Sequence, residues 1–245
     1  MYKQTIGIVG GFGAYATLNF YKSLLEAFKS DSERNYPRIL MDNDFTMPSR
    51  TRALLYGEEE ETIARMIADS IEHLIHAGAD KIILVCGTAH YFLPKVYELV
   101  PQAKDKVIHL IELLADRIAT DGDEVKDVAL IAAEGTLKQS VYDKILIQKG
   151  IRVVKPEEEE YPRVRKFIEC IKQNTLSYDD MEDFLVFLDQ LLPDEKKKQV
   201  ILGCTEFPVL VEALREEKVF EERMKHIEFF DPLEMVIDEL KKILV

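Results

Sequence analysis

The chain has 245 residues, of which 47% are hydrophobic and 31% are charged. This apolar content excludes a disordered chain, and no apolar run approaches the roughly 20 residues that a membrane-spanning helix needs. With 32 Lys and Arg against 45 Asp and Glu, the net charge of −13 argues against a nucleic-acid or anionic-membrane partner. A small anionic ligand, held by a few local cations, remains possible.

The first residues, MYKQTIGIVGGFG, have the pattern of a buried strand and a glycine turn rather than that of an export signal. The chain has three cysteines, an odd number that fits free thiols better than a disulfide framework. Both features favour a cytoplasmic protein.

Short β-branched apolar runs alternate with amphipathic stretches of helical length along the whole chain. We expect strands near residues 5–9, 38–42, 81–85, 107–110, 127–132, 151–154, 199–203 and 227–230. We expect helices near residues 15–29, 58–77, 91–99, 111–120, 137–149, 162–173, 179–192, 208–216 and 232–243. In residues 58–77, Ile63, Ile67 and Ile71 recur at helical spacing, and Gly78 follows as a C-terminal cap would. The alternation predicts an α/β fold whose parallel sheets are covered on both faces.

The polar segment 120–126 separates two halves in which the same pattern of strands and helices recurs. We therefore expect two similar three-layer domains, each with a parallel four-stranded sheet. The active site would lie in the cleft between them.

A glycine turn follows the first expected strand. Gly11, Gly13 and Ala16 have the spacing G-x-G-x-x-A of dinucleotide-binding turns. The acid that should bind a ribose about 20 residues later is not clearly placed, because Asp42 and Asp44 come late. A bound carboxylate, or close packing of strand on helix, therefore explains the glycines better than a nucleotide does.

Two cysteines stand in matching places. Cys86 and Cys204 each close an apolar strand beside a threonine and a glycine, and each precedes a helix with a proline near its start. The carboxyl ends of parallel strands form the ligand crevice, and a helix N-terminus favours a thiolate. A free cysteine often serves packing alone, as we expect for Cys170 within a helix, but two in equivalent settings favour chemistry.

Two such thiols could bind a metal, form a disulfide or act as acid and base. Neither cysteine lies in a C-x-x-C motif and the five histidines do not cluster, which disfavours a metal site and a redox pair. Proton transfer remains, in which one thiolate removes a proton from one face of a carbon and the opposite thiol delivers one to the other face. That geometry is what inversion of a stereocentre requires.

Six motifs, in family order, make the chain resemble the aspartate/glutamate racemase family, and its aspartate racemase branch in particular. They are GIVGGFGAYAT (7–17), NDFTMPSRT (43–51), CGTAH (86–90), AAEGT (132–136), GCTE (203–206) and DP (231–232). The resemblance implies a cofactor-independent racemase of aspartate, glutamate or a related amino acid, often dimeric. It also implies that the C-terminal helix returns to the first domain, so that residues 1–115 with 225–245 form one domain and 116–224 the other.

Carried over by position, Cys86 and Cys204 match the two catalytic bases of the family. The implied substrate contacts are Gly11, Asn43, Arg50, Gly87, Thr88, Glu134, Gly135, Thr136, Arg163 and Thr205. His90 and Glu206 follow the thiols, and either could relay a proton. The alternatives are a histidine bonded to the backbone at a helix start and an acid favoured by the helix dipole. We expect no metal and no cofactor.

Two positions depart from the family pattern. Gly87 stands where the family usually has an asparagine, and losing such a polar contact in a buried site costs about 1–3 kcal/mol. Pro162 stands where aspartate-specific members carry a lysine, with Arg163 next to it as a candidate distal cation. We expect Arg50 and Arg52 to lie in a polar loop with Pro48 and Ser49. Arg50 suits bidentate binding of a carboxylate, whereas Arg52 is a weaker candidate.

Two alternatives to a racemase stay open. The first is an isomerase or decarboxylase of a small dicarboxylic acid with the same fold and cysteine pair. The second is an amino-acid-binding protein without enzymatic activity, which Gly87 would favour.

Overall fold

The computed structural model describes residues 2, 4–120, 127–193 and 197–244. The chain forms two compact units, Met1–Leu113 with Leu233–Val245 (unit 1) and Leu114–Pro232 (unit 2). Of the polar segment 120–126, only Thr120 lies within the described residues, and it is the last residue of a helix. No helix in the described part of the chain has the length and apolar character needed to cross a membrane.

Unit 1 contains a parallel sheet with the strand order β2-β1-β3. Its strands are β1 (Ile6–Val9), β2 (Ile39–Asp42) and β3 (Lys81–Leu84). A fourth strand was expected at 107–110, and this prediction is wrong. Only Val107 forms a bridge, to Ile82, because a helix already begins at Leu110.

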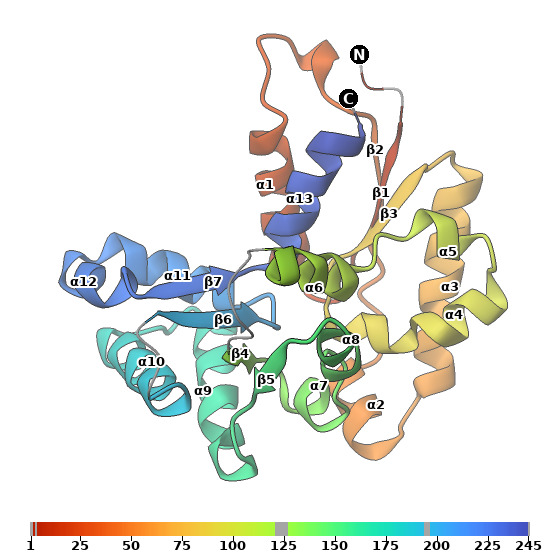
Figure 1. Cartoon of the computed structure of the whole chain (residues 1–245). Helices are drawn as coiled ribbons and strands as arrows, with labels where there is room; N and C mark the ends of the chain where they lie inside the picture. Colours follow the sequence, from red (N-terminus) through yellow and green to blue (C-terminus); the bar gives the residue numbers. More distant parts are fainter. Residues whose placement is uncertain (1, 3, 121–126, 194–196, 245) are drawn as a thin grey trace. The chain divides into compact units, whose positions relative to one another are not determined.

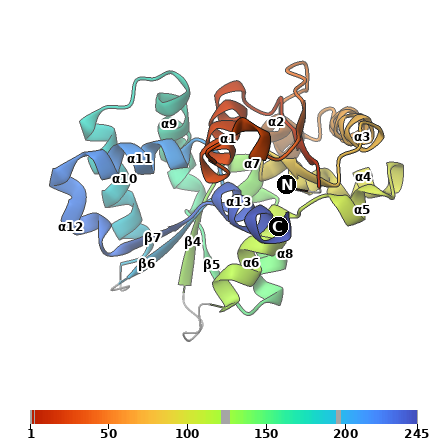
Figure 2. The ribbon, with the colours of Figure 1, turned by 90° about the horizontal axis from the view of Figure 1, so that it is seen from above.

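Helices cover both faces of the sheet in unit 1. They are α1 (Ala14–Ala27), α2 (Arg50–Tyr56), α3 (Glu60–His76), α4 (Leu93–Leu99), α5 (Ala103–Lys106) and α13 (Pro232–Ile243), with 3-10 turns at Glu33–Asn35 and Thr88–Phe92. Ile6, Ile8 and Ile83 share one apolar cluster with α1 and α13, which lie side by side in both views (Figures 1 and 2). On the other face, a Cβ added to Gly7 would lie 3.3 Å from Leu74 of α3. Helix α6 (Leu110–Thr120) begins in unit 1 and contains the boundary between the units.

Unit 2 contains a parallel four-stranded sheet with the order β5-β4-β6-β7, and the expected α/β class with parallel sheets is confirmed. Its strands are β4 (Asp127–Ile131), β5 (Arg152–Val154), β6 (Lys198–Leu202) and β7 (Ile227–Phe230). Lys198 of β6 pairs with Ile227 of β7. Residues 225–232, which we expected in the first domain, are therefore part of unit 2, and the chain returns to unit 1 at Leu233.

An aromatic core holds the helices of unit 2 against this sheet. The helices are α7 (Glu134–Lys138), α8 (Asp143–Gln148), α9 (Tyr161–Lys172), α10 (Tyr178–Leu191), α11 (Phe207–Glu216) and α12 (Glu221–Met224), with 3-10 turns at Glu158–Glu160 and Lys218–Phe220. Phe167 of α9, Phe184 of α10 and Phe207 of α11 cluster with Ile131 and Leu202 of the sheet. Burial of such large side chains is the main stabilising contribution to the unit.

Two expected elements differ from the structure. The single helix expected over 137–149 is broken into α7 and α8, because Ser140 adopts a left-handed backbone with φ of 50°. The polar loop expected around Arg50 and Arg52 is instead helix α2, whose first turn is capped by Ser49 Oγ accepting the Arg52 amide at 3.3 Å.

Candidate active site

The glycine turn after β1 packs tightly against the segment that follows β2. Gly11 has a φ of +80°, and a Cβ there would overlap the backbone of Asp44, so only glycine fits. A Cβ on Gly10 would likewise overlap the side chain of Asn43, while the Gly10 amide donates to the Asp42 carbonyl at 2.8 Å. Gly11 and Asn43, two predicted site residues, therefore lie together at the carboxyl edge of the sheet.

Arg50 reaches this turn from the start of α2. Its guanidinium donates to the Phe12 carbonyl and, at 3.1 Å, to the Pro48 carbonyl, and it lies 5.2 Å from the centre of the Phe12 ring. Its Nε is buried and has no hydrogen-bond partner among the described residues. A buried donor without a partner is costly, so Arg50 is a fixed cation with one donor still to satisfy. Arg52, by contrast, is paired with Glu58 at 2.9 Å.

Cys86 lies just beyond β3, beside the glycine turn. The Val85 amide donates to the Val9 carbonyl at 3.1 Å, which aligns the end of β3 with the end of β1. Cys86 is a free, half-buried thiol, and Thr88 behind it is buried at the start of the 3-10 turn. Gly87 is the N-cap of that turn with ordinary right-handed dihedrals, so the geometry does not require glycine there.

His90 does not have the geometry of a proton relay. Its Nδ1 lies 3.0 Å from the Cys86 carbonyl, and its Nε2 accepts the Leu110 amide at 3.2 Å. Burial, reinforced by the neighbouring His109, lowers the pKa of His90 to about 3. His90 is thus a neutral histidine bonded to the backbone, which was the alternative to the relay.

In unit 2, Cys204 occupies the matching place after β6. The Gly203 amide donates to the Ile131 carbonyl at 2.8 Å, and a Cβ on Gly203 would lie only 2.8 Å from Ala132. Cys204 is half-buried, and its thiol donates to Glu206 Oε2 at 2.9 Å. Thr205 donates to the same oxygen at 3.3 Å. Glu206 therefore has the position of a proton acceptor for Cys204.

The segment after β4 brings Glu134, Gly135 and Thr136 to the carboxyl edge of the second sheet, where α7 begins. Gly135 and Thr136 are buried. The Glu134 carboxylate binds Arg165 and, at 3.2 Å, Lys138. Burial raises the pKa of Glu134, but the two cations lower it by more, so that the pKa lies below its ordinary value. Glu134 is therefore an anion flanked by two cations.

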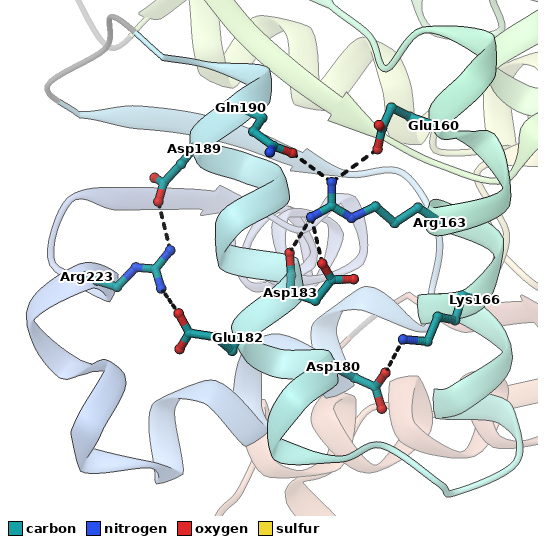
Figure 3. A network of polar contacts seen from close by, with 9 residues as sticks. All are labelled: Glu160, Arg163, Lys166, Asp180, Glu182, Asp183, Asp189, Gln190 and Arg223. Carbon is teal, nitrogen blue, oxygen red and sulfur yellow. Dashed lines mark hydrogen bonds and ion pairs between the residues drawn. The ribbon is translucent and has the colours of Figure 1, made fainter.

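Arg163, the candidate distal cation, lies elsewhere, between α9 and α10 (Figure 3). Its guanidinium binds Asp183 at 2.7 Å, Gln190 at 2.7 Å and Glu160 at 3.2 Å, and it stacks over Phe187. Burial lowers the pKa of Arg163, but the two carboxylates raise it above its ordinary value. Its charge is already compensated, so it is not a free substrate cation.

Two cations, Arg165 and Lys138, bind Glu134 near the end of β4. The sequence did not identify either of them as a site residue. Val164, Phe167 and Ile168 mark the buried face of α9, and Arg163 and Arg165 flank that face on its two sides. Helical periodicity therefore cannot choose between them. Lys138 could have been suspected from its place four residues after Glu134, a spacing that allows a helical ion pair.

A cavity of about 370 Å³ in unit 1 is a rival location for a ligand. It lies between α1 and the edge strand β2 and is lined by Ala14, Thr17, Leu18, Tyr21, Ile39, Met41 and Asn43. Its walls are mainly apolar and include no cysteine, so it does not fit proton transfer by a thiol.

Comparison with known proteins identifies the family of the chain. A sequence model of the Asp/Glu/hydantoin racemase family matches residues 9–240. The broad specificity amino-acid racemase RacX of Bacillus subtilis (strain 168) is 25% identical over 173 residues, which cover 69% of this chain and 71% of RacX. A glutamate racemase of Carboxydothermus hydrogenoformans is 21% identical over 178 residues, covering 72% of this chain and 63% of that protein.

A solved structure shows the same fold. Picrophilus torridus aspartate racemase superposes with a TM-score of 0.75 at 24% identity, covering 98% of this chain and 94% of that one. At this identity the likeness concerns the fold alone. The family match, in contrast, extends over both units. The chain therefore belongs to the Asp/Glu/hydantoin racemase family and is an isomerase of the amino-acid racemase type.

Proposed function

We propose that the protein is a cofactor-independent aspartate racemase in which Cys86 and Cys204 act on opposite faces of the substrate α-carbon. The observation that carries the proposal is the equivalent placement of the two thiols. Cys86 follows β3, which pairs with β1, and Cys204 follows β6, which pairs with β4. Both are half-buried at the carboxyl ends of parallel strands, where ligands of such sheets bind.

The two thiols divide the proton transfers. One cysteine, as the thiolate, takes the α-proton and becomes a thiol, while the other gives its proton to the opposite face and becomes a thiolate. The number of protons is conserved, and the reverse reaction starts from the resulting state. When Cys204 gives its proton to the substrate, Glu206 orients the S–H group through the 2.9 Å contact. When Cys204 acts as the base, Glu206 first takes the thiol proton and then, as the neutral acid, donates a hydrogen bond to the thiolate.

The α-hydrogen of an amino acid is a very weak acid, so the charge that develops on the carboxylate must be stabilised. Backbone amides of the glycine turn around Gly11 are the first candidates, together with Asn43, Thr88 and Thr205. Arg50 binds a substrate carboxylate, for which its unpaired Nε and its fixed position are the support.

We assign the second carboxylate of the substrate to the end of β4, where Glu134, Gly135 and Thr136 lie. Arg163 is left out of the proposed set because its guanidinium binds Asp183 and Gln190 of α10 rather than the segment after β4. Arg165 and Lys138 replace it as the cations nearest to this segment. A dicarboxylate is the substrate class that such cations favour over a neutral amino acid.

Incubation with single enantiomers in D₂O tests the reaction and its substrate. We expect L- and D-aspartate to exchange the α-proton and to interconvert, and L-alanine to exchange more slowly because it lacks the second carboxylate. Glutamate as the faster substrate would overturn the assignment of aspartate. Binding without any exchange would favour the amino-acid-binding protein, and loss of carboxylate as CO₂ would favour the decarboxylase.

We further propose a cytoplasmic homodimer. The support is the family resemblance and the odd number of cysteines, three, which fits a reducing compartment. Sedimentation equilibrium should give twice the chain mass of 28.2 kDa, and a single-chain mass would contradict the dimer.

A further inference from the structure

His90 is a buried polar side chain that the proposed reaction does not use. It lies in the 3-10 turn Thr88–Phe92, directly after the strand end that carries Cys86, and is 4% exposed. A buried imidazole is costly unless both nitrogens have partners. In His90 both do, and both partners are backbone atoms.

The two hydrogen bonds define the tautomer. The Cys86 carbonyl can only accept, so Nδ1 carries the proton and donates to it. The Leu110 amide can only donate, so Nε2 is unprotonated and accepts from it. The ring therefore connects the residue that bears the thiol to the first residue of α6.

The amide that His90 accepts is one of the four N–H groups that a helix N-terminus leaves unpaired. A second such group, the Glu112 amide, donates to Nδ1 of His109 at 3.3 Å. The two histidine rings touch edge to face with centroids 4.9 Å apart. The start of α6 is thus capped by two neutral histidines, and of these His90 also binds the Cys86 carbonyl.

We propose that His90 is a positioning residue for the Cys86 thiol. It holds the Cys86 carbonyl in place, and so fixes the backbone from which the side chain extends. The Cys86 carbonyl also accepts the Ala89 amide at 3.2 Å, so two donors occupy it. With both donors in place, the negative end of this carbonyl dipole is less available to repel a neighbouring thiolate. The inference rests on the proposed role of Cys86.

Two substitutions separate the two bonds of the ring. In His90→Asn the side-chain amide lies where Nδ1 was, so it can still donate to the Cys86 carbonyl, but the Leu110 amide loses its acceptor. In His90→Gln the amide lies where Nε2 was, so it can still accept from Leu110, but the Cys86 carbonyl loses its donor. If His90 positions the thiol, only His90→Gln should change the reactivity of Cys86.

The readout is the rate at which iodoacetamide alkylates each cysteine, followed by mass spectrometry of the peptides from the full chain between pH 6 and 9. We expect His90→Gln to slow alkylation of Cys86 roughly fivefold at neutral pH, the loss of one positioning hydrogen bond. His90→Asn should leave that rate close to the parent value. Cys204, in the other unit, is the internal control and should react equally in all three proteins. An unchanged Cys86 rate in His90→Gln, or an equal change at both cysteines, would overturn the inference.

A second measurement needs no variant and covers the case in which His90→Gln fails to fold. Nitrogen-15 NMR of the histidine rings in the parent should show His90 as the neutral tautomer protonated at Nδ1, down to pH 5. A ring protonated at Nε2, or an imidazolium at pH 6, would contradict the two bonds. Neither readout requires turnover. A protein without racemase activity that still shows the expected alkylation pattern would refute the proposed function alone.

Discussion

The two units carry a cysteine at the same place in the same strand pattern, but they surround it with different chemistry. In each unit the first strand is flanked by the second on one side and by the cysteine-bearing third on the other, as β2-β1-β3 and β5-β4-β6. Cys204 donates to the carboxylate of Glu206. The Cys86 carbonyl, by contrast, accepts a hydrogen bond from His90, which is neutral and bonded only to backbone atoms in these contacts. The shared topology places the thiols, and in the proposed mechanism the residues two to four positions later set how each thiol transfers its proton.

The cations of the two units differ in the same way. Arg50 in unit 1 contacts carbonyl oxygens and an aromatic ring and keeps an unpaired donor. In unit 2, Arg163 is compensated by Asp183 and Glu160, and Arg165 binds Glu134 (Figure 3 shows the Arg163 network). In the proposed mode of binding, Arg50 of unit 1 can therefore accept a carboxylate directly, whereas a carboxylate bound in unit 2 must replace an existing ion pair.

The largest expected effect tests whether both thiols are needed. Cys86→Ser and Cys204→Ser should each lower the rate of racemisation by roughly 10²–10⁴-fold, because proton transfer by a positioned group contributes about that much. Cys170→Ser, on helix α9 and away from any strand end, is the matched control and should keep the parent rate. Full activity in either of the first two variants would break the equivalence of the units.

A smaller loss should follow from changing Arg50 in unit 1. Arg50→Lys keeps the charge but removes the bidentate donor. It should lower kcat/KM about 10- to 100-fold, because that is the range for loss of a hydrogen bond to a charged group. Arg52→Lys, whose side chain is exposed and paired with Glu58, should leave kcat/KM unchanged. Equal effects of the two substitutions would assign Arg50 a role in folding only.

Replacing the acid beside Cys204 should have a still smaller effect. Glu206→Gln removes the proton acceptor but preserves the shape, and we expect turnover to fall about tenfold. In the substrate-free protein the change should alter alkylation of Cys204 and leave Cys86 unaffected. If Glu206 only serves the dipole of α11, the Cys204 alkylation rate will not respond.

Substitution of the two arginines of α9 should separate an effect on protein stability from an effect on substrate binding. Arg163→Ala removes ion pairs and the contact with Phe187, and should lower the free energy of unfolding by about 1–2 kcal/mol without raising KM. Arg165→Ala, with an exposed side chain, should raise KM for aspartate and change stability little. Denaturant unfolding and initial rates on the same preparations measure both quantities. The opposite pattern would restore Arg163 as the substrate cation.

The smallest effect concerns pH. The pKa of His90 is lowered from 6.5 to about 3 in the folded protein, so below pH 6.5 the unfolded chain binds a proton that the folded one does not. The contribution is complete above about pH 6.5 and is lost as the pH falls, by up to about 1.4 kcal/mol per pH unit. His109, whose pKa burial also lowers although Glu112 opposes this, adds in the same direction. His90→Asn should flatten the decline in urea midpoints between pH 6.5 and 5, and an unchanged decline in that variant would contradict the assignment to His90.

The fold could be predicted from the sequence wherever apolar spacing decided the structure. Ile63, Ile67 and Ile71 lie on the buried face of α3, and Gly78 follows that helix with a φ of +93°. Periodicity failed where one backbone angle or one cap decided instead. Ser140 breaks a helix with a left-handed conformation, and Ser49 starts one with its hydroxyl.

The candidate site could be predicted in its positions more than in its interactions. The strand ends that carry Cys86 and Cys204 follow from apolar runs and from the rule for parallel sheets. The partners of His90 and Arg163 do not, because Leu110 is 20 residues from His90 and Asp183 is 20 residues from Arg163. Contacts over such separations depend on how helices pack, which a single sequence does not encode locally.

The central claim is that both thiols act on one α-carbon, and a crystal structure with bound aspartate tests it most directly. The account predicts the two sulfur atoms on opposite sides of the α-carbon, each at roughly 3–4 Å, a distance from which a proton can be transferred. Aspartate bound with only one sulfur near the α-carbon, or with both on the same side, would contradict it.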